Sequence, residues 1–148
     1  DLTWGAFKCD FTKNEFRLPT EAEWEYACRA GTSTKYYNGT TVDELQNAAW
    51  CKENSNESTH SVGQKESNEW GLYDMIGNVN EWCLDMYTGD NYKKHNKKNP
   101  AVLEGGSNRM LRGGDWASLP VIARSAGRMN SPPNWSYNIT GFRLKRVP

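Results

Sequence analysis

The chain has 148 residues, 36% of them hydrophobic and 24% charged, which is enough for one domain with its own core. Lysine plus arginine and aspartate plus glutamate both number 18, so the charge gives no reason to expect nucleic acid or an anionic membrane as partner. No apolar run in this sequence reaches the length of a membrane span, and its first residues do not have the pattern of a signal peptide. We expect a piece of a longer protein.

The first predicted element is a helix in RLPTEAEWEYACRAGT. Thr20 and Glu23 form a T-x-x-E capping box at its start, and Gly31 is expected to cap its end. Trp24 and Cys28, with Ala27 beside them, share the face that would pack on a core. Residues 32–71 are mostly polar and small, so we expect irregular structure there, interrupted by tryptophans.

Strands are expected in the second half of the chain. The segment GLYDMIGNVNEWCLDMY combines a glycine turn with an alternating stretch that puts Trp82, Leu84 and Met86 on one side. RMLRGGDW and the terminal GFRLKRV also have strand character, with Phe142 and Leu144 on one face of the latter. Together these elements predict an α+β domain with long loops.

The cysteines give no clear metal site. Cys9, Cys28, Cys51 and Cys83 include no C-x-x-C pair, and the chain has only two histidines, so a zinc site lacks its usual close ligand pairs. Two disulfides, or four buried thiols, are both compatible with the sequence.

Three blocks together resemble one family. They are FRLPTEAEWEYACRAGT (16–32), WGLYDMIGNVNEWCLDMY (70–87) and RMLRGGDW…ARSAGR…GFRLKR (109–146). In this order they resemble the formylglycine-generating-enzyme (sulfatase-modifying factor) domain, which is similar to an elaborated C-type-lectin fold. The resemblance implies that residues 1–148 are the C-terminal part of one such domain.

Catalytic members of this family oxidise a substrate cysteine with a cysteine pair that binds copper, placed shortly after the glycine pair of the last block. Copper(I) prefers thiolate ligands, but this chain has no cysteine after Cys83, and Ser118 stands where the first thiol would be. A related oxygenase branch uses histidines on iron, for which the candidates here are His60 and His95. A copper or iron oxidase or oxygenase is therefore the alternative, and no enzyme activity or required cofactor is the main expectation.

The sequence resembles more closely the variable proteins of diversity-generating retroelements, in which a fixed frame holds residues altered by adenine-directed mutagenesis. The frame here is Arg112-Gly113-Gly114, Trp116, Ala123 to Ala126, Arg128, and Gly141-Phe142-Arg143. We expect residues 109–146 to be the variable region, and the arginines Arg124, Arg128 and Arg143 to belong to its scaffold. We call the altered residues between the frame positions the fill.

The fill is typical of adaptable binding surfaces, which use aromatic, small and amide side chains. Randomised adenines in an asparagine codon can give Asn, Ser, Tyr, Leu, Val, Ala or Gly, but not Met, Trp, Lys or Glu; Met129 and Trp135 therefore depart from the rule. The residues predicted to contact a ligand are Trp116, Ala117, Ser118, Leu119, Val121, Gly127, Met129, Asn130, Ser131, Asn134, Trp135, Ser136, Tyr137 and Asn138.

The resemblance also implies a structural calcium site in the turn before the alternating segment, at Asp74, Gly77, Val79 and Glu81, because carboxylate and carbonyl oxygens suit calcium. The alternative is that these carboxylates cap backbone N–H groups. The resemblance further implies a protein or glycan ligand at the variable surface and a place on a bacterial cell surface or outside the cell.

Overall fold

A computed structural model describes residues 14–89 and 100–146. Its elements are, in chain order, β1 (Phe16–Arg17), α1 (Glu21–Arg29), α2 (Val42–Ala48), β2 (Asn80–Tyr87), β3 (Asn108–Arg112), β4 (Arg128–Ser131), β5 (Thr140–Gly141) and β6 (Lys145–Arg146). Cys9 and His95 lie outside the described residues.

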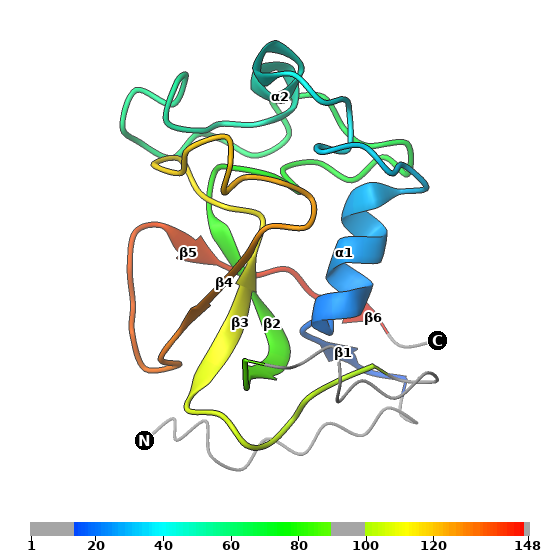
Figure 1. The fold of residues 1–148 in the computed structure, drawn as a ribbon, viewed down its shortest axis with the longest axis vertical. Helices are drawn as coiled ribbons and strands as arrows, with labels where there is room; N and C mark the ends of the chain where they lie inside the picture. Colours follow the sequence, from blue (N-terminus) through cyan, green and yellow to red (C-terminus); the bar gives the residue numbers. More distant parts are fainter. Residues whose placement is uncertain (1–13, 90–99, 147–148) are drawn as a thin grey trace.

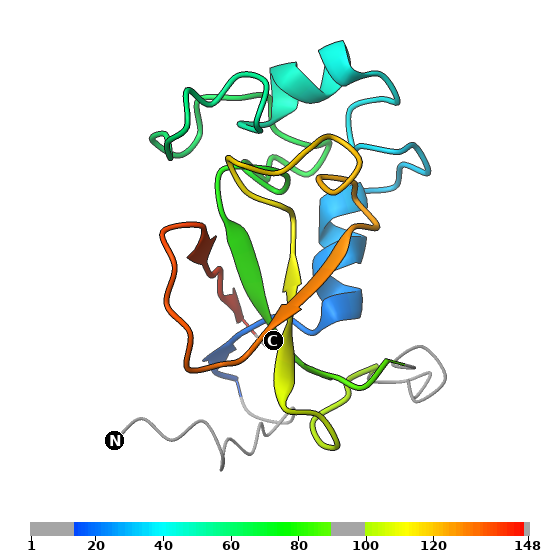
Figure 2. The same ribbon diagram turned by 60° about the vertical axis from the view of Figure 1, so that its left-hand side comes forward.

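The strands form two sheets. The central sheet has the order β4-β3-β2-β5, with β5 parallel to β2 and the other pairs antiparallel, while β1 and β6 form a separate antiparallel pair. Helix α1 stands beside the central sheet and α2 lies beyond one end of it (Figure 1). Long connections fill the space around α2 (Figure 2). The fold is α+β and loop-rich, which confirms the predicted class.

Helix α1 begins as its sequence predicts. Thr20 is the N-cap, its hydroxyl accepts a hydrogen bond from the Glu23 N–H, and the Glu23 side chain completes the capping box. The end is different, because the left-handed cap is Ala30 (φ 45°) and Gly31 follows it with φ 94°. The prediction of Gly31 as the cap was therefore one residue late.

The helix packs on a face of β2 that carries buried acids. The Trp24 indole N–H donates to Glu81 at 2.7 Å, and the backbone N–H of Glu21 donates to Asp85 at 2.7 Å. Asp85 is completely buried, and it also accepts a hydrogen bond from the backbone N–H of Val102. The acids are tolerated in the core because each one has partners that replace water.

The regular elements that were not expected from the sequence include α2 and β4, besides the short β1. Helix α2 lies within the stretch predicted to be irregular, and it has a capping box of its own, formed by Thr41 and Glu44. Strand β4 lies inside the predicted variable region and pairs with β3, opposing Met110 to Asn130. The fill of that region is therefore held partly on a strand.

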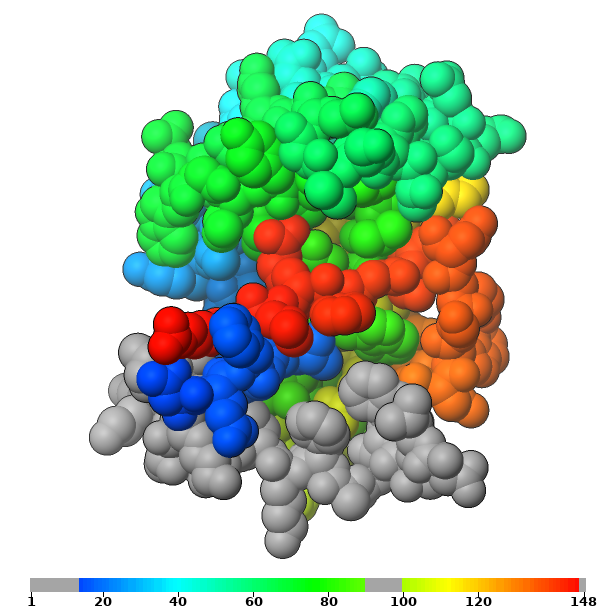
Figure 3. All heavy atoms as spheres, turned by 180° about the vertical axis from the view of Figure 1, so that it is seen from behind, coloured from blue at the N-terminus to red at the C-terminus, as the bar shows by residue number. Residues whose placement is uncertain are grey.

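The C-terminal strand is interrupted. The sequence predicts one strand through GFRLKRV, but the structure has β5 and β6 on either side of residues 142–144. Arg143 lies within the break, and its guanidinium donates to both carboxylate oxygens of Glu81 at 2.5 and 2.6 Å. Residues 145–146 then pair with residues 16–17, and Figure 3 shows from behind the two ends of the described chain lying side by side.

Glu23 joins the start of α1 to both strands of the small sheet. Its carboxylate accepts two hydrogen bonds from Arg17 at 2.7 Å and one from Lys145 at 2.7 Å. Partial burial raises the pKa of Glu23, but these hydrogen bonds outweigh it and lower the pKa from 4.5 to about 2. Because the folded state binds this proton less tightly, the stabilisation is complete above the unfolded pKa and is lost as the pH falls toward 2.

We therefore expect Glu23→Gln to reduce the free energy of unfolding by about 1 kcal/mol at pH 6, a value discounted for solvent screening. Urea unfolding at pH 6 and pH 3 should show this difference shrinking at the lower pH. The matched control is Glu57→Gln, a change in an exposed loop side chain. An equal effect of Glu23→Gln at both pH values would contradict the assignment.

Candidate functional site

The segment 115–127, which connects β3 to β4, starts from a fixed turn. Gly113 and Gly114 have φ values of 96° and 74°, a region that favours glycine. The buried Asp115 follows: its carboxylate accepts a hydrogen bond from the Ala117 N–H at 2.8 Å, and its own N–H donates to the Ser118 hydroxyl at 3.1 Å. An aspartate turn of this kind holds the backbone independently of the exposed side chains.

The same segment is anchored to the rest of the fold through its backbone. The Trp116 N–H donates to the carbonyl of Asn78 at 3.0 Å, and the Ser55 hydroxyl donates to the Trp116 carbonyl at 2.8 Å. The N–H of Lys52 donates to the carbonyl of Ser118 at 3.1 Å. Side chains in this stretch can therefore change without removing the contacts that hold the main chain.

The later part of the segment is anchored to residues 35–36. The Tyr36 hydroxyl donates to the carbonyl of Pro120 at 3.1 Å, and the Ser125 N–H donates to the carbonyl of Lys35 at 3.1 Å. Tyr36 is fully buried. This end of the segment is thus fixed by the core and not by its own exposed residues.

A second segment, 132–139, connects β4 to β5 and carries two exposed aromatic side chains. Trp135 and Tyr137 meet edge to face, with ring centroids 5.4 Å apart, and they are 53% and 46% exposed. The Trp135 N–H donates to the carbonyl of Pro132 at 3.1 Å, and the Tyr137 carbonyl accepts two hydrogen bonds from Thr140. The backbone therefore presents the aromatic pair in a defined geometry.

The two segments lie on different parts of the surface. Segment 115–127 lies at the end of the central sheet near α2, while segment 132–139 runs along the side of the sheet to β5 (Figures 1 and 2). They are joined where the Trp116 indole N–H donates to the carbonyl of Asn138 at 3.4 Å. The predicted ligand residues thus form two patches that meet at Trp116 instead of one continuous face.

Most of the predicted ligand residues reach solvent. Trp116 and Met129 are half-buried, and the exposed members are Ala117, Leu119, Val121, Asn130, Asn134, Trp135, Ser136, Tyr137 and Asn138. The buried members are Ser118, Gly127 and Ser131.

The buried members have structural roles, so their prediction as surface residues was wrong. The Ser118 hydroxyl belongs to the Asp115 turn. Ser131 faces Arg109 in the β3–β4 pair. Ile122, by contrast, was not predicted to contact a ligand, but its side chain is 41% exposed. In the sequence, only its place next to the predicted ligand residue Val121 could have indicated this.

The scaffold arginines hold the variable region to the helix and the sheet. Arg128 binds both carboxylate oxygens of the buried Glu21. Arg143 binds Glu81, as described above, and also donates to the carbonyls of Tyr73 and Asp74. These two scaffold predictions are confirmed.

Two other frame residues lie differently from the prediction. The Arg124 side chain is exposed, and within the described residues only its backbone takes part in hydrogen bonds. Phe142 is 66% exposed, so this frame residue does not hold the region through a buried side chain. Their surroundings are loops and the interrupted C-terminal strand, which offer no enclosed space for a long side chain.

The residues predicted to bind calcium do come together. Asp74, Gly77, Val79 and Glu81 line a hollow of about 430 Å³, together with Arg143 and others. Their oxygens are already engaged, because Glu81 accepts hydrogen bonds from Trp24 and Arg143, and Asp74 accepts one from the Gly63 N–H at 2.7 Å.

Glu81 already has a cationic partner, because the Arg143 guanidinium donates to both of its carboxylate oxygens. No group of three or more His, Cys, Asp or Glu side chains in the described part of the chain has metal-binding geometry. Asp74 accepts from the Gly63 N–H as the alternative of a backbone cap predicts, whereas Glu81 accepts from side-chain donors instead. Calcium binding at this turn stays a prediction.

The three cysteines in the described part of the chain are not arranged as a copper site. Cys28, Cys51 and Cys83 are buried and free, which contradicts a disulfide among these three. Burial raises the pKa of Cys28 to about 12 and also raises the pKa of Cys83. A copper ligand or nucleophile must be a thiolate, so these protonated thiols have the environment of structural cysteines.

The ring of His60 is also committed to the fold. It stacks on Trp50 with centroids 3.7 Å apart, and its Nε2 atom lies 2.7 Å from the carbonyl oxygen of Ser55. Lys65 lies 3.9 Å from the Trp50 ring. The histidine therefore belongs to a packed aromatic cluster, and no carboxylate joins it to form an iron site among the described residues.

Comparisons with known proteins identify the family of this chain. Residues 5–147 match the family described as the sulfatase-modifying factor enzyme 1-like domain. The chain is 40% identical over 136 residues to serine/threonine-protein kinase pkn1 of Chlamydia caviae, covering 88% of this chain and 21% of the kinase. It is 34% identical over 144 residues to the formylglycine-generating enzyme of Streptomyces coelicolor, covering 86% of this chain and 45% of the enzyme.

Among solved structures, variable protein 1 of Treponema denticola is similar with a TM-score of 0.85 and 42% identity, covering 94% of this chain and 50% of that protein. The chain therefore spans about half the length of this solved relative and less than half of the two curated ones. In the described part of the chain, no helix is both long and apolar enough to span a bilayer.

Proposed function

Because this chain belongs to the sulfatase-modifying factor enzyme 1-like family, which its match over residues 5–147 shows, we propose that it is a non-catalytic, ligand-binding variable protein of a diversity-generating retroelement. The observation that carries the proposal is that, within residues 112–143, some residues fix the main chain and others are exposed to solvent. Buried side chains and backbone contacts fix the main chain, while most of the fill is exposed. The similarity to a Treponema variable protein supports the same function.

The exposed fill has the chemistry of a binding surface. It contains large apolar side chains, such as Leu119, Val121, Trp135 and Tyr137, and small polar ones between them. Aromatic side chains give contact area at a low entropy cost, and Ser and Asn supply adaptable hydrogen bonds. A surface of this kind can change its ligand while the frame stays constant.

The chemistry of the catalytic members is not supported by these residues. Ser118 stands where their first copper-binding cysteine would be, and its hydroxyl is used inside the Asp115 turn. Cys28, Cys51 and Cys83 are buried and distant in sequence from this turn. We propose a protein or glycan as the ligand and the bacterial cell surface or the extracellular space as the location.

The genomic locus tests this function. We expect a near-copy of the codons for residues 109–146 beside a reverse transcriptase gene, with adenines in the codons of exposed fill positions. Among isolates, the codons for Asn134, Ser136 and Tyr137 should vary. Those for Gly127 and Ser131 should stay constant, because these two residues are buried.

Amplicon sequencing of the gene and its surroundings from many isolates gives this measurement. The retroelement assignment would be wrong if the codons of buried and exposed residues varied equally among isolates, or if no near-copy were found. Stoichiometric copper or iron in the purified chain, with dioxygen uptake on a cysteine-containing peptide, would favour the enzyme alternative.

A further inference from the structure

The exposed side chains between β4 and β5 alternate between small polar and aromatic ones. Residues 134–138 read Asn-Trp-Ser-Tyr-Asn, and all five are exposed. Within the described part of the chain, the side chains of Asn134, Ser136 and Asn138 make no hydrogen bond. Their amide and hydroxyl groups are therefore available to a ligand.

The aromatic pair of this strip keeps its ring faces accessible. The planes of the Trp135 and Tyr137 rings are inclined by 76°, and in an edge-to-face pair the contact covers only one face of one ring. No charged residue occurs between Ser131 and Gly141. The strip thus combines open aromatic faces with neutral hydrogen-bonding groups.

This combination matches the chemistry of a pyranose sugar. One face of such a ring carries C–H groups, whose slight positive charge suits the electron-rich face of an aromatic side chain. Its edge carries hydroxyl groups that both donate and accept hydrogen bonds, as amide and hydroxyl side chains also do. A neutral sugar needs no charged partner, so the uncharged strip is sufficient for it.

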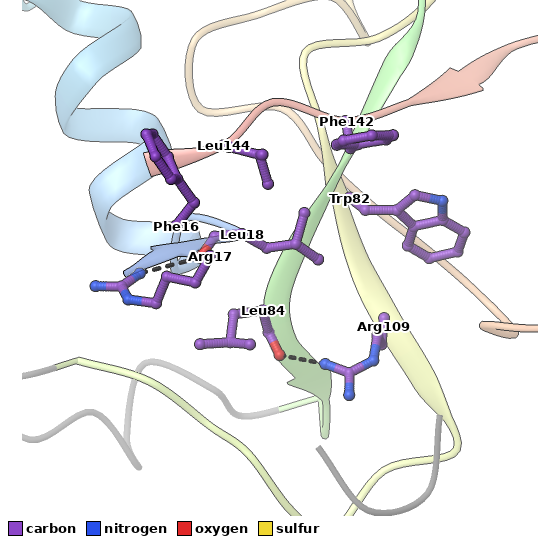
Figure 4. A pocket seen from close by; sticks show the side chains of 8 residues that line it. All are labelled: Phe16, Arg17, Leu18, Trp82, Leu84, Arg109, Phe142 and Leu144. Carbon is purple, nitrogen blue, oxygen red and sulfur yellow. Dashed lines mark hydrogen bonds between the residues drawn. The ribbon is translucent and has the colours of Figure 1, made fainter. Parts of the chain in front are cut away.

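Two other apolar surfaces of the described chain lack this combination. In the segment that connects β3 to β4, the large exposed side chains are the aliphatic Leu119, Val121 and Ile122, which cannot hydrogen-bond a hydroxyl group. A hollow of about 390 Å³ lies among β1, β2 and β3, and apart from Arg17 and Arg109 its lining side chains are aliphatic or aromatic (Figure 4). Neither surface offers the small neutral groups that sugar hydroxyls require.

Trp135 also differs from its neighbours in the residues that can replace it. An asparagine codon with randomised adenines can give the Asn, Ser and Tyr found at positions 134 and 136–138, but it cannot give Trp. Under the proposed function, the neighbours of Trp135 are therefore open to change while the indole stays constant.

We propose that residues 134–138 form a glycan-binding strip, in which Trp135 is a constant stacking platform for a neutral pyranose. This assignment rests on the proposed function, and at this patch it narrows the ligand to a glycan. Stacking on an indole suits many pyranoses, so the platform fixes the class of ligand. The changing side chains around it read the pattern of hydroxyl groups and select among sugars.

An array of neutral and anionic oligosaccharides, probed with the fluorescently labelled chain, gives the first measurement. We expect binding to neutral glycans that expose a pyranose face. The neutral glycan that binds most strongly is then titrated calorimetrically, and Trp135→Ala should weaken its affinity roughly tenfold or more. Trp135→Phe, which keeps a ring, should restore most of this loss. Because Trp135 is exposed, its replacement by alanine should leave the Tm within about 2 °C.

Trp70→Ala is the matched control for this titration. Trp70 is 49% exposed and meets Tyr26 edge to face with ring centroids 5.0 Å apart, but its neighbours are Glu69 and Gly71. This variant should bind the glycan as the unchanged chain does. Equal losses in the two alanine variants would indicate non-specific aromatic contact and overturn the proposal, as would the absence of binding to every neutral glycan.

A protein array probed in parallel distinguishes the other class of ligand. If the chain bound an enzymatically deglycosylated protein, and Trp135→Ala abolished that binding, the strip would belong to a protein partner and the glycan assignment would be wrong.

The retroelement assignment and the glycan assignment fail separately. If the locus has no near-copy, the first is lost, but the titration still measures sugar binding at the strip. If the near-copy is present and no neutral glycan binds, only the second is lost. Among isolates, the codon for Trp135 should be constant while those for Asn134 and Ser136 vary, and equal variation at all three positions would contradict a constant platform.

Discussion

Replacing Arg112 with methionine is expected to destabilise the protein by about 3–5 kcal/mol, the range for breaking a buried charge network. The Arg112 side chain has no solvent exposure, and its guanidinium binds the Glu25 carboxylate and the carbonyls of Gly127 and Ser125. It also lies 5.3 Å from the ring centre of Trp24. Methionine has a similar length but cannot donate a hydrogen bond to any of these acceptors.

A matched control uses the same carboxylate. Arg29 also pairs with Glu25, at 2.9 Å and four residues away on α1, but its side chain is 26% exposed. Arg29→Met should cost only about 0.3–0.5 kcal/mol, as is usual for an exposed helical pair. Urea unfolding of both variants measures the difference, and similar losses for the two would contradict a central role for Arg112.

This network explains why the frame around the variable region is so regular. Arg112 joins β3 to α1 through Glu25, and Arg128 joins β4 to α1 through Glu21. The two strands that flank segment 115–127 are therefore both tied to the same helix. Changes in the exposed side chains of that segment leave these ties intact, which is what a diversified surface requires.

The sequence predicted α1 well because its signals are local. The Thr20 capping box and the Trp24–Cys28 face need only neighbouring residues to be recognised. Helix α2 has the same kind of cap at Thr41, but its apolar face consists of only Val42, Leu45 and Ala48, which is too short to stand out among the surrounding polar residues. Strand β4 was missed because Met129, Asn130 and Ser131 show no alternation of apolar and polar side chains.

The candidate site was predicted in its composition more than in its geometry. Which residues belong to the frame could be inferred from the order of the motifs. Which of the residues are exposed could not be inferred, because Ser118 and Gly127 look like ordinary loop residues in the sequence. Their burial depends on the Asp115 turn and on the carbonyl of Ile122, contacts that exist only once the chain has folded.

Gly127→Ala is expected to destabilise the protein by about 1–3 kcal/mol or more, as overpacking of a closed site does. A Cβ atom built on Gly127 would lie 2.1 Å from the carbonyl oxygen of Ile122 and 3.0 Å from that of Arg124. Both obstacles are backbone atoms, so no side chain can move aside. The Gly127 N–H also donates to the Arg124 carbonyl at 2.7 Å, and its carbonyl accepts from Arg112.

Because these contacts tie the turn at residues 122–127 to the arginine network, the strain of an added methyl group should spread to the scaffold and not only to the loop. Asn134→Ala, in an exposed position of the other segment, is the matched control and should leave the Tm within about 1 °C. Thermal unfolding of both variants measures the contrast. If Gly127→Ala were as stable as Asn134→Ala, position 127 would be free to vary, and Gly127 would belong to the fill and not to the frame.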